Sequence, residues 1–171
     1  IVELATRNTV GLEALSRFAG EPLRSPDLWF EEATSVGLGP ELEMKAVRRA
    51  VAQLWQIPSD EFLAVNASPE LVLSGKLDEL ADAAICPRLV LELTEHIAVD
   101  DYGPIHDRMA PLRERGARVA VDDTGAGFSS LRHILLLQPE IIKLDRSLTR
   151  GVDEDPARRA LAASLVAFAK D

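Results

Sequence analysis

The 171-residue sequence is short of cysteine and of long apolar runs, and each shortage excludes a class of protein. Cys86 is the one cysteine, so an intrachain disulfide is excluded and a reducing compartment is favoured. The longest apolar stretch, around residues 165–169, is far too short to span a bilayer, which takes about 20 residues. Because no signal peptide is visible either, we expect a cytoplasmic domain without membrane contact.

Basic residues are also scarce. Lys and Arg total 19 against 28 Asp and Glu, which gives a net charge of −9. Nucleic acid polymers and anionic membrane surfaces are bound by basic faces, so neither is an expected partner. Glycine motifs that cradle phosphates are missing, and the three histidines show no ligand spacing. A small phosphorylated ligand held through metal ions stays compatible with this composition.

The sequence does contain strands that alternate with helices. Proline follows a residue suited to a helix start at 25–26, 39–40, 68–69 and 155–156. A four-residue turn joins the first two expected strands, too short for a parallel crossover, so we expect that pair to be antiparallel. The later strands are expected to form a parallel sheet with helical crossovers. The expected strands are 1–4, 9–15, 62–65, 89–93, 118–121 and 141–144.

Six strands leave two architectures open. One is an open six-stranded sheet, and the other is a barrel without its last two units, because a closed eight-stranded barrel takes about 250 residues. An open end would expose an apolar strand edge, which soluble proteins avoid. We therefore expect residues 1–171 to form a single domain that lacks roughly 70 residues of a barrel.

Polar side chains recur at the carboxyl ends of the expected strands. In a parallel barrel these ends converge on one mouth. Each such residue alone is more often a surface or capping group, but joint placement on five successive strands favours a site. The residues are Glu13, Asn66, Glu92 with Glu95, Asp122 with Asp123, and Lys143 with Asp145.

Carboxylates and a carboxamide without His or Cys point to Mg²⁺, Mn²⁺ or Ca²⁺ rather than structural zinc. Several carboxylates in one cleft repel each other unless cations neutralise them. Two ions about 3.5–4 Å apart form the usual apparatus for hydrolysing phosphate esters. Lys143 would supply a cation from inside the barrel, and Arg17, just past the second strand, would grip a phosphate from the rim.

The motifs, in this order, resemble those of the EAL domain family, bacterial cyclic di-GMP phosphodiesterases built on a modified TIM barrel. The resemblance spans nearly the whole chain. It implies an α/β fold, a modified (β/α)8 barrel with an antiparallel first strand pair, here lacking its last two strand units. The matching segments are Glu13-Ala14-Leu15 with Arg17, Val65-Asn66-Ala67-Ser68, Glu92-Leu93-Thr94-Glu95, the run from Asp122 to Ser130, and Lys143-Leu144-Asp145.

The resemblance implies a role for each matching residue. Asp123 is similar to the acid that serves a second metal or its bridging water. Lys143 resembles the lysine that contacts the catalytic water or phosphate, and Arg17 the arginine that grips the substrate. Glu95 matches the residue that anchors the glycine loop, which in the family couples the active site to a dimer interface. The implied metal ligands are Glu13, Asn66, Glu92 and Asp122.

The implied reaction is hydrolysis of cyclic di-GMP to linear pGpG with one or two Mg²⁺ or Mn²⁺ ions. Implied partners are a second copy of the chain and attached sensory or GGDEF-type domains. Two departures stand out: Thr124 occupies a position where the family usually has an aromatic residue, and the family's general-base glutamate belongs to a seventh strand that these 171 residues lack. A non-catalytic cyclic di-GMP receptor and a protein-interaction module stay open as alternatives.

Overall fold

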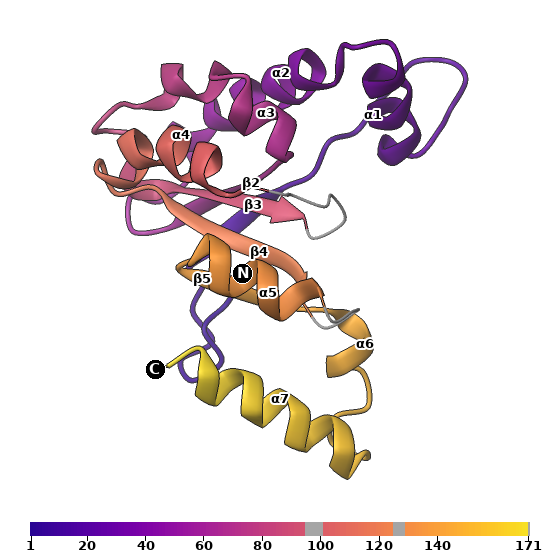
Figure 1. The fold of residues 1–171 in the computed structure, drawn as a ribbon, viewed down its shortest axis with the longest axis vertical. Helices are drawn as coiled ribbons and strands as arrows, with labels where there is room; N and C mark the ends of the chain where they lie inside the picture. The colour runs from indigo at the N-terminus through magenta and orange to yellow at the C-terminus, as the bar shows by residue number, and fades with distance from the viewer. Residues whose placement is uncertain (95–100, 125–128, 171) are drawn as a thin grey trace.

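The computed structural model describes residues 1–94, 101–124 and 129–170, and its centre is one parallel sheet (Figure 1). The strands lie side by side in sequence order, and every neighbouring pair is parallel. A curved parallel sheet in sequence order is the arrangement of a barrel wall. The strands are β1 (Gly11–Ala14), β2 (Phe62–Ala67), β3 (Leu89–Thr94), β4 (Arg118–Thr124) and β5 (Ile141–Leu144).

Helices connect successive strands, as the alternation in the sequence predicts. The proline starts are confirmed: proline is the first residue of α1, α3 and α7 and the second of α2. The α-helices are α1 (Pro26–Ser35), α2 (Gly39–Val51), α3 (Pro69–Leu73), α4 (Gly103–Arg113), α5 (Ser129–Leu137), α6 (Arg146–Thr149) and α7 (Pro156–Phe168). Three short 3₁₀ helices accompany them: η1 (Leu54–Gln56), η2 (Lys76–Leu80) and η3 (Cys86–Arg88).

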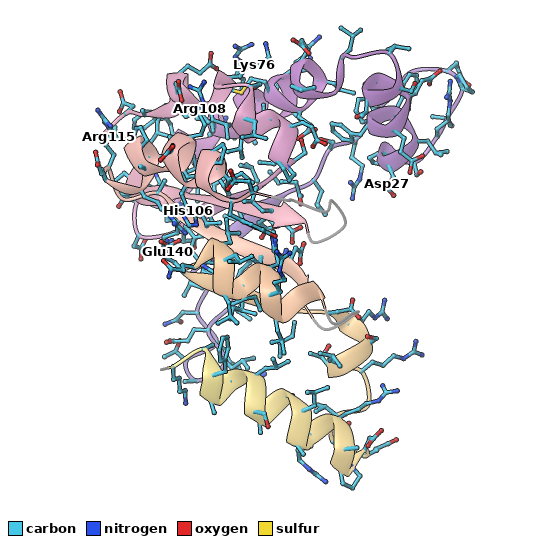
Figure 2. The ribbon with its side chains drawn as sticks, in the orientation of Figure 1. Asp27, Lys76, His106, Arg108, Arg115 and Glu140 are labelled. Carbon is cyan, nitrogen blue, oxygen red and sulfur yellow. The ribbon has the colours of Figure 1, made fainter. Side chains whose placement is uncertain are left out.

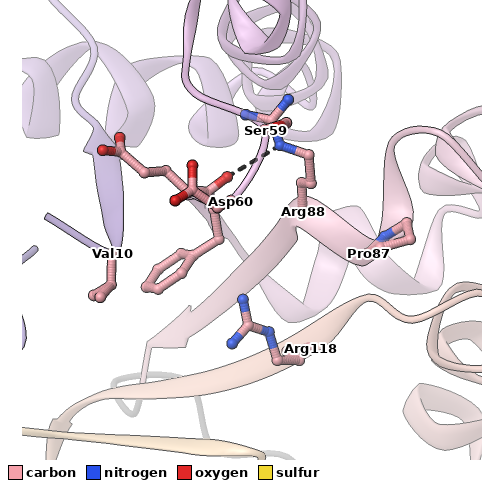
Figure 3. A pocket seen from close by; sticks show the side chains of 8 residues that line it. Val10, Ser59, Asp60, Pro87, Arg88 and Arg118 are labelled. Atoms are coloured by element: carbon pink, nitrogen blue, oxygen red, sulfur yellow. Dashed lines mark hydrogen bonds between the residues drawn. The ribbon is translucent and has the colours of Figure 1, made fainter.

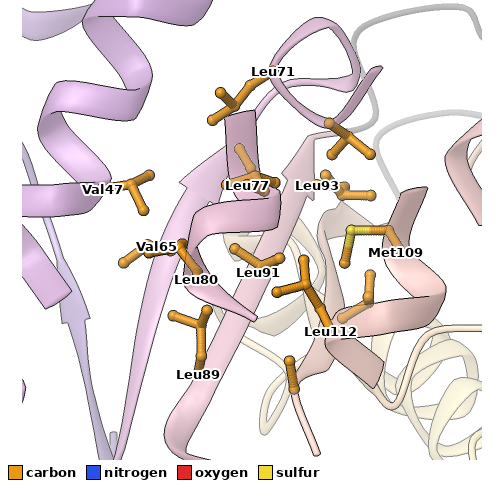
Figure 4. Close-up of a cluster of buried hydrophobic side chains, with 14 of the residues drawn as sticks. Val47, Val65, Leu71, Leu77, Leu80, Leu89, Leu91, Leu93, Met109 and Leu112 are labelled. Carbon is orange, nitrogen blue, oxygen red and sulfur yellow. The ribbon is translucent and has the colours of Figure 1, made fainter. Parts of the chain in front are cut away.

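The two faces of the sheet carry different clusters, because successive side chains of a strand point to opposite faces. On the outer face, Val65, Leu91 and their neighbours pack under α2, α3 and α4 in the main hydrophobic core (Figure 4). Beyond this helical layer lie charged side chains such as Lys76 and Arg108 (Figure 2). On the inner face a smaller apolar cluster joins four strands: Phe62, Ala64, Val90, Ala120 and Ile141.

The expected antiparallel strand pair at the amino terminus is not confirmed. Val2 and Thr9 form an isolated antiparallel bridge, residues 1–4 are not a strand, and β1 pairs with β2 in parallel. The side chains of Ile1, Val2 and Leu4 are 49%, 54% and 91% exposed. Because they bury little apolar surface, nothing stabilises a longer ladder there. The described residues therefore form five strands rather than six.

None of the helices in the described part of the chain combines the length and the apolar character that a membrane span requires.

Candidate metal centre

A polar layer lies directly above the inner apolar cluster. Because every second residue of a strand faces the same side, moving two residues along β2 to β5 from the cluster reaches the next inner position, and Glu13 of β1, which pairs with Ala64, faces the same side. These positions lie towards the carboxyl ends of the strands, where α/β barrels place their active sites. The layer has one residue from each strand: Glu13, Asn66, Glu92, Asp122 and Lys143.

Three carboxylates in this layer come together. Glu13, Glu92 and Asp122 each offer an oxygen atom, and the three oxygens all lie within 4.8 Å of one another. Glu92 is 1% exposed, whereas the side chains of Asp122 and Glu13 are 20% and 32% exposed. The deepest acid is therefore covered by protein, and the two outer acids face the opening of the half-barrel.

The spacing of these oxygens fits a hard divalent cation. Opposite ligands of one Ca²⁺ lie about 5 Å apart, and those of Mg²⁺ about 4 Å apart, given their usual metal–oxygen distances. A separation of at most 4.8 Å thus suits Ca²⁺ directly and Mg²⁺ or Mn²⁺ after a small contraction. Glu13, Glu92 and Asp122 would be the residues that hold the ion.

Lys143 lies among the three acids. Its Nζ donates to Glu92 Oε2 at 2.8 Å and to Asp122 Oδ2 at 2.9 Å, and it is 3.7 Å from Glu13 Oε1. Three carboxylates around one ammonium leave two negative charges uncompensated when all groups are ionised. One divalent cation would balance that excess.

The same contacts set the protonation of the cluster. Burial lowers the pKa of Lys143, but the hydrogen bonds to Glu92 and Asp122 outweigh burial and hold that pKa above its ordinary value. Burial raises the pKa of Glu92, and the Lys143 hydrogen bond opposes it. The lysine therefore stays charged, and the buried acid depends on a nearby cation to stay ionised.

Asn66 is the neighbour of Glu92 in the β2–β3 register and is exposed at the end of β2. Two residues later, Ser68 caps α3 and contacts Glu43 of α2. Burial raises the pKa of Glu43, and the hydrogen bonds from Ser68 oppose that shift. Glu43 is absent from the expected site residues, because its contact with Ser68 joins segments 25 residues apart and leaves no local pattern in the sequence.

Arg17 is exposed and donates to the backbone oxygen of Ser16 at 2.7 Å. It lines a cavity of about 890 Å³ together with Glu43, Asn66 and Ser68. The structure therefore brings the expected phosphate-gripping residue to the same cavity as the expected ligand Asn66.

Asp123 and Glu95 are the other two residues expected in the site. Asp123 belongs to β4, and its role stays a prediction. Glu95 and the glycines Gly125 and Gly127 lie outside the residues that the structure describes.

The sheet and its acidic mouth are those of a barrel-type α/β domain whose carboxylates are placed to hold a hard cation. Comparison with known families sharpens this, because the EAL domain model matches residues 1–171. The chain belongs to the EAL domain family. The family expected from the motifs is thereby confirmed.

Curated relatives and solved structures are similar to this chain over nearly its whole length. Cyclic di-GMP phosphodiesterase PA2567 of Pseudomonas aeruginosa is 30% identical over 98% of this chain and 30% of that protein. A manganese and cyclic di-GMP complex of Klebsiella pneumoniae BlrP1 superposes with a TM-score of 0.84 at 26% identity, over 99% of this chain and 45% of that one. An EAL domain protein of Listeria monocytogenes, 21% identical, gives a TM-score of 0.85 over 99% and 70% of the two chains and supports the fold alone.

These superpositions confirm the expected TIM-barrel type of α/β fold, of which this chain forms five parallel strands. The chain spans less than a third of the length of the curated relatives that it matches.

Proposed function

We propose that the protein containing this chain hydrolyses one phosphodiester bond of cyclic di-GMP to give linear pGpG, with Mg²⁺ or Mn²⁺. The observation that carries the proposal is the acidic triad, in which Glu13, Glu92 and Asp122 from three strands bring oxygens within 4.8 Å. The names of PA2567 and of the BlrP1 complex supply the substrate, and the latter also supplies a metal.

In this proposal Asn66 completes the ligand set of Glu13, Glu92 and Asp122, and one or two divalent ions supply activation of water and charge stabilisation at the phosphate. Asp123, next to Asp122, takes a second ion or its bridging water. The ligand set is supported by the inner-face register that places Asn66 beside Glu92.

Two cationic side chains would hold the substrate. Lys143, which keeps its proton, presents a positive charge beside Glu92 and Asp122, where it would contact the phosphate or the attacking water. Arg17, in the cavity next to Asn66, would bind a phosphate oxygen with its forked donors. Glu95 would anchor the glycine loop.

The wider setting is also part of the proposal. Residues 1–171 would act as one EAL-type domain of a longer cytoplasmic protein, as a homodimer and attached to sensory or GGDEF-type domains. A solved relative, Vibrio cholerae LapD, contains GGDEF and EAL segments together and is bound to cyclic di-GMP.

The test is product analysis of the purified protein with cyclic di-GMP, with Mn²⁺ and with EDTA. We expect pGpG with Mn²⁺ and none with EDTA. Glu13→Gln should abolish product, whereas Glu114→Gln, at an exposed position after α4, should leave the rate unchanged. Binding of cyclic di-GMP without pGpG in the presence of Mn²⁺ would contradict hydrolysis and favour the receptor alternative.

A further inference from the structure

A glutamate outside the polar layer reaches the end of β2. Glu43 of α2 accepts two hydrogen bonds from Ser68: the backbone N–H of Ser68 donates to Oε2 at 2.8 Å, and the Ser68 hydroxyl donates to Oε1 at 2.8 Å. One carboxylate thus holds one residue, 25 positions away, through both of its oxygens. Such a two-point contact fixes orientation as well as distance.

Ser68 is where the strand turns into the next helix. Its side chain also accepts from the backbone N–H of Leu71 at 3.1 Å, and its carbonyl oxygen accepts from Val72 N at 3.1 Å, so it begins α3. Through Ser68, Glu43 therefore ties three elements together: α2, the end of β2 and the start of α3.

The helix that presents Glu43 is itself firmly packed. Met44 and Val47 are 1% and 2% exposed in the main core, so α2 is fixed against the sheet. Glu43 lies part-buried between α2 and Ser68. A carboxylate loses hydration there, and burying an apolar side chain at this position would cost less free energy. Its two hydrogen bonds offset that loss and give the end of β2 a fixed acceptor.

Asn66 lies between two anchors. On one side the β2–β3 ladder holds it in register with Glu92. On the other side, two residues on, Glu43 holds Ser68. A metal ligand must be placed to a fraction of an ångström, and Mg²⁺ demands nearly ideal octahedral geometry. Groups that orient a ligand without touching the ion typically change metal affinity by about 10–100-fold when they are removed.

We propose that Glu43 is a positioning residue that fixes Asn66 for metal binding by clamping Ser68, an inference that rests on the proposed function only for the role of Asn66 as a ligand. The length of the Glu43 side chain, rather than its charge, is what the positioning of Ser68 requires. Glutamine, which has the same length, can keep both contacts, since its oxygen accepts from Ser68 N–H and its amide donates to the hydroxyl oxygen. Aspartate keeps the charge and is one carbon too short for both.

The test measures Mn²⁺ affinity of the protein by calorimetry without any substrate. Glu43→Ala and Glu43→Asp should weaken binding by about 10–100-fold, whereas Glu43→Gln should stay close to the wild type. Glu41→Ala is the matched control, because Glu41 is on the same helix and pairs with Lys76 on the surface at 3.0 Å. Glu41→Ala should bind Mn²⁺ as the wild type does.

A second readout follows Asn66 directly and needs no metal. Residues 1–171 contain two asparagines, Asn8 and Asn66, so asparagine labelling reports the side-chain amides of both within this domain by NMR. Glu43→Asp should shift or broaden the Asn66 amide signal, Glu43→Gln should restore it, and the Asn8 signal should stay unchanged. Asn8 is exposed in the amino-terminal turn, so a cooperative thermal melting transition, rather than the Asn8 signal, shows that each variant is folded.

Three results would overturn the inference. The first is an unchanged Mn²⁺ affinity in both Glu43→Ala and Glu43→Asp, and the second is weak Mn²⁺ binding in Glu43→Gln with normal binding in Glu43→Asp. The third is an Asn66 amide signal that is the same in the wild type and in Glu43→Asp. The second result would assign the change in Mn²⁺ affinity to the charge of the side chain instead of its length. A protein that shows the expected Mn²⁺ and NMR pattern and yet makes no pGpG would contradict the proposed hydrolysis and support the positioning role, so the two failures are distinguishable.

Discussion

The two ends of the sheet differ in the groups that surround their charged side chains. At the carboxyl end, three carboxylates crowd around Lys143, and negative charge is left in excess. At the amino end, a cavity of about 390 Å³ is lined by Arg88 and Arg118 together with Asp60 and Glu61, and backbone carbonyl groups hold Arg88 there (Figure 3). Arg88 donates to the carbonyl oxygens of Leu54, Ile57, Pro58 and Glu61.

Arg118 is the second arginine that lines the cavity at the amino end. Its guanidinium lies 4.7 Å from the ring centroid of Phe62, beside the inner apolar cluster. Groups that are satisfied within the protein stabilise the fold, whereas like charges held together are unfavourable unless a ligand compensates them. The amino end is therefore expected to serve stability and the carboxyl end to serve binding, the division typical of a barrel.

The largest expected effect is at the buried acid of the carboxyl end. Glu92→Gln replaces one oxygen of a proposed metal ligand by an NH2 group and removes the negative charge that faces Lys143, so Mn²⁺ affinity should fall by more than about 100-fold, beyond the loss typical of outer partners. Calorimetry with Mn²⁺ measures this. Retained affinity would remove Glu92 from the metal centre and break the contrast between the two ends.

Lys143→Met should separate stability from binding. It leaves three carboxylates without their ammonium, and we expect the metal-free protein to lose about 2–3 kcal/mol of unfolding free energy, below the value for a fully buried pair because the lysine is 27% exposed. Mn²⁺ should then raise the melting temperature more than in the wild type. Lys76→Met, at a surface pair with Glu41, is the control and should change neither quantity measurably.

At the amino end, Arg88→Ala should lower the unfolding free energy by about 2 kcal/mol, because it leaves part-buried carbonyl groups without their donor. Urea unfolding measures the loss. Mn²⁺ affinity should be that of the wild type at temperatures where the variant is folded. A tenfold loss of affinity would mean that the two ends are not separate in function.

The smallest effect is expected at a surface pair that belongs to neither end. The hydrogen bond from Arg48 lowers the pKa of the Glu79 carboxyl below its ordinary value. A lowered carboxyl pKa stabilises the folded state above the unfolded value and loses that contribution as pH falls through the folded value. Glu79→Gln should therefore melt slightly below the wild type at pH 7, and the gap should close towards pH 3. A gap that persists at pH 3 would assign the effect to packing.

Much of the fold could be predicted from local signals. Proline after a capping residue gives the starts of α1, α3 and α7, and apolar strand runs give β2 to β5, because both signals act within a few residues. The strand expected at residues 1–4 is wrong, since apolar sequence makes a strand only where the sheet or a core covers it, and Leu4 is 91% exposed.

The site could be predicted only in part for a similar reason. The alternation of strand residues, combined with parallel pairing, places Glu13, Glu92 and Asp122 on one face, so their meeting was predictable. Contacts between distant segments leave no local pattern, which is why the Glu43–Ser68 pair, 25 residues apart, was missed. The two-sided contact of Lys143 with Glu92 and Asp122 likewise depends on the geometry of three strands.

We propose that the carboxyl end of the sheet holds a divalent cation on Glu13, Glu92 and Asp122, and anomalous diffraction from crystals grown with Mn²⁺ would locate that ion. We predict an anomalous peak among the three carboxylates, in contact with Asn66, and no peak in the cavity at Arg88 and Arg118. Saturating Mn²⁺ with no peak among the carboxylates, or with its strongest peak elsewhere on the chain, would contradict the account.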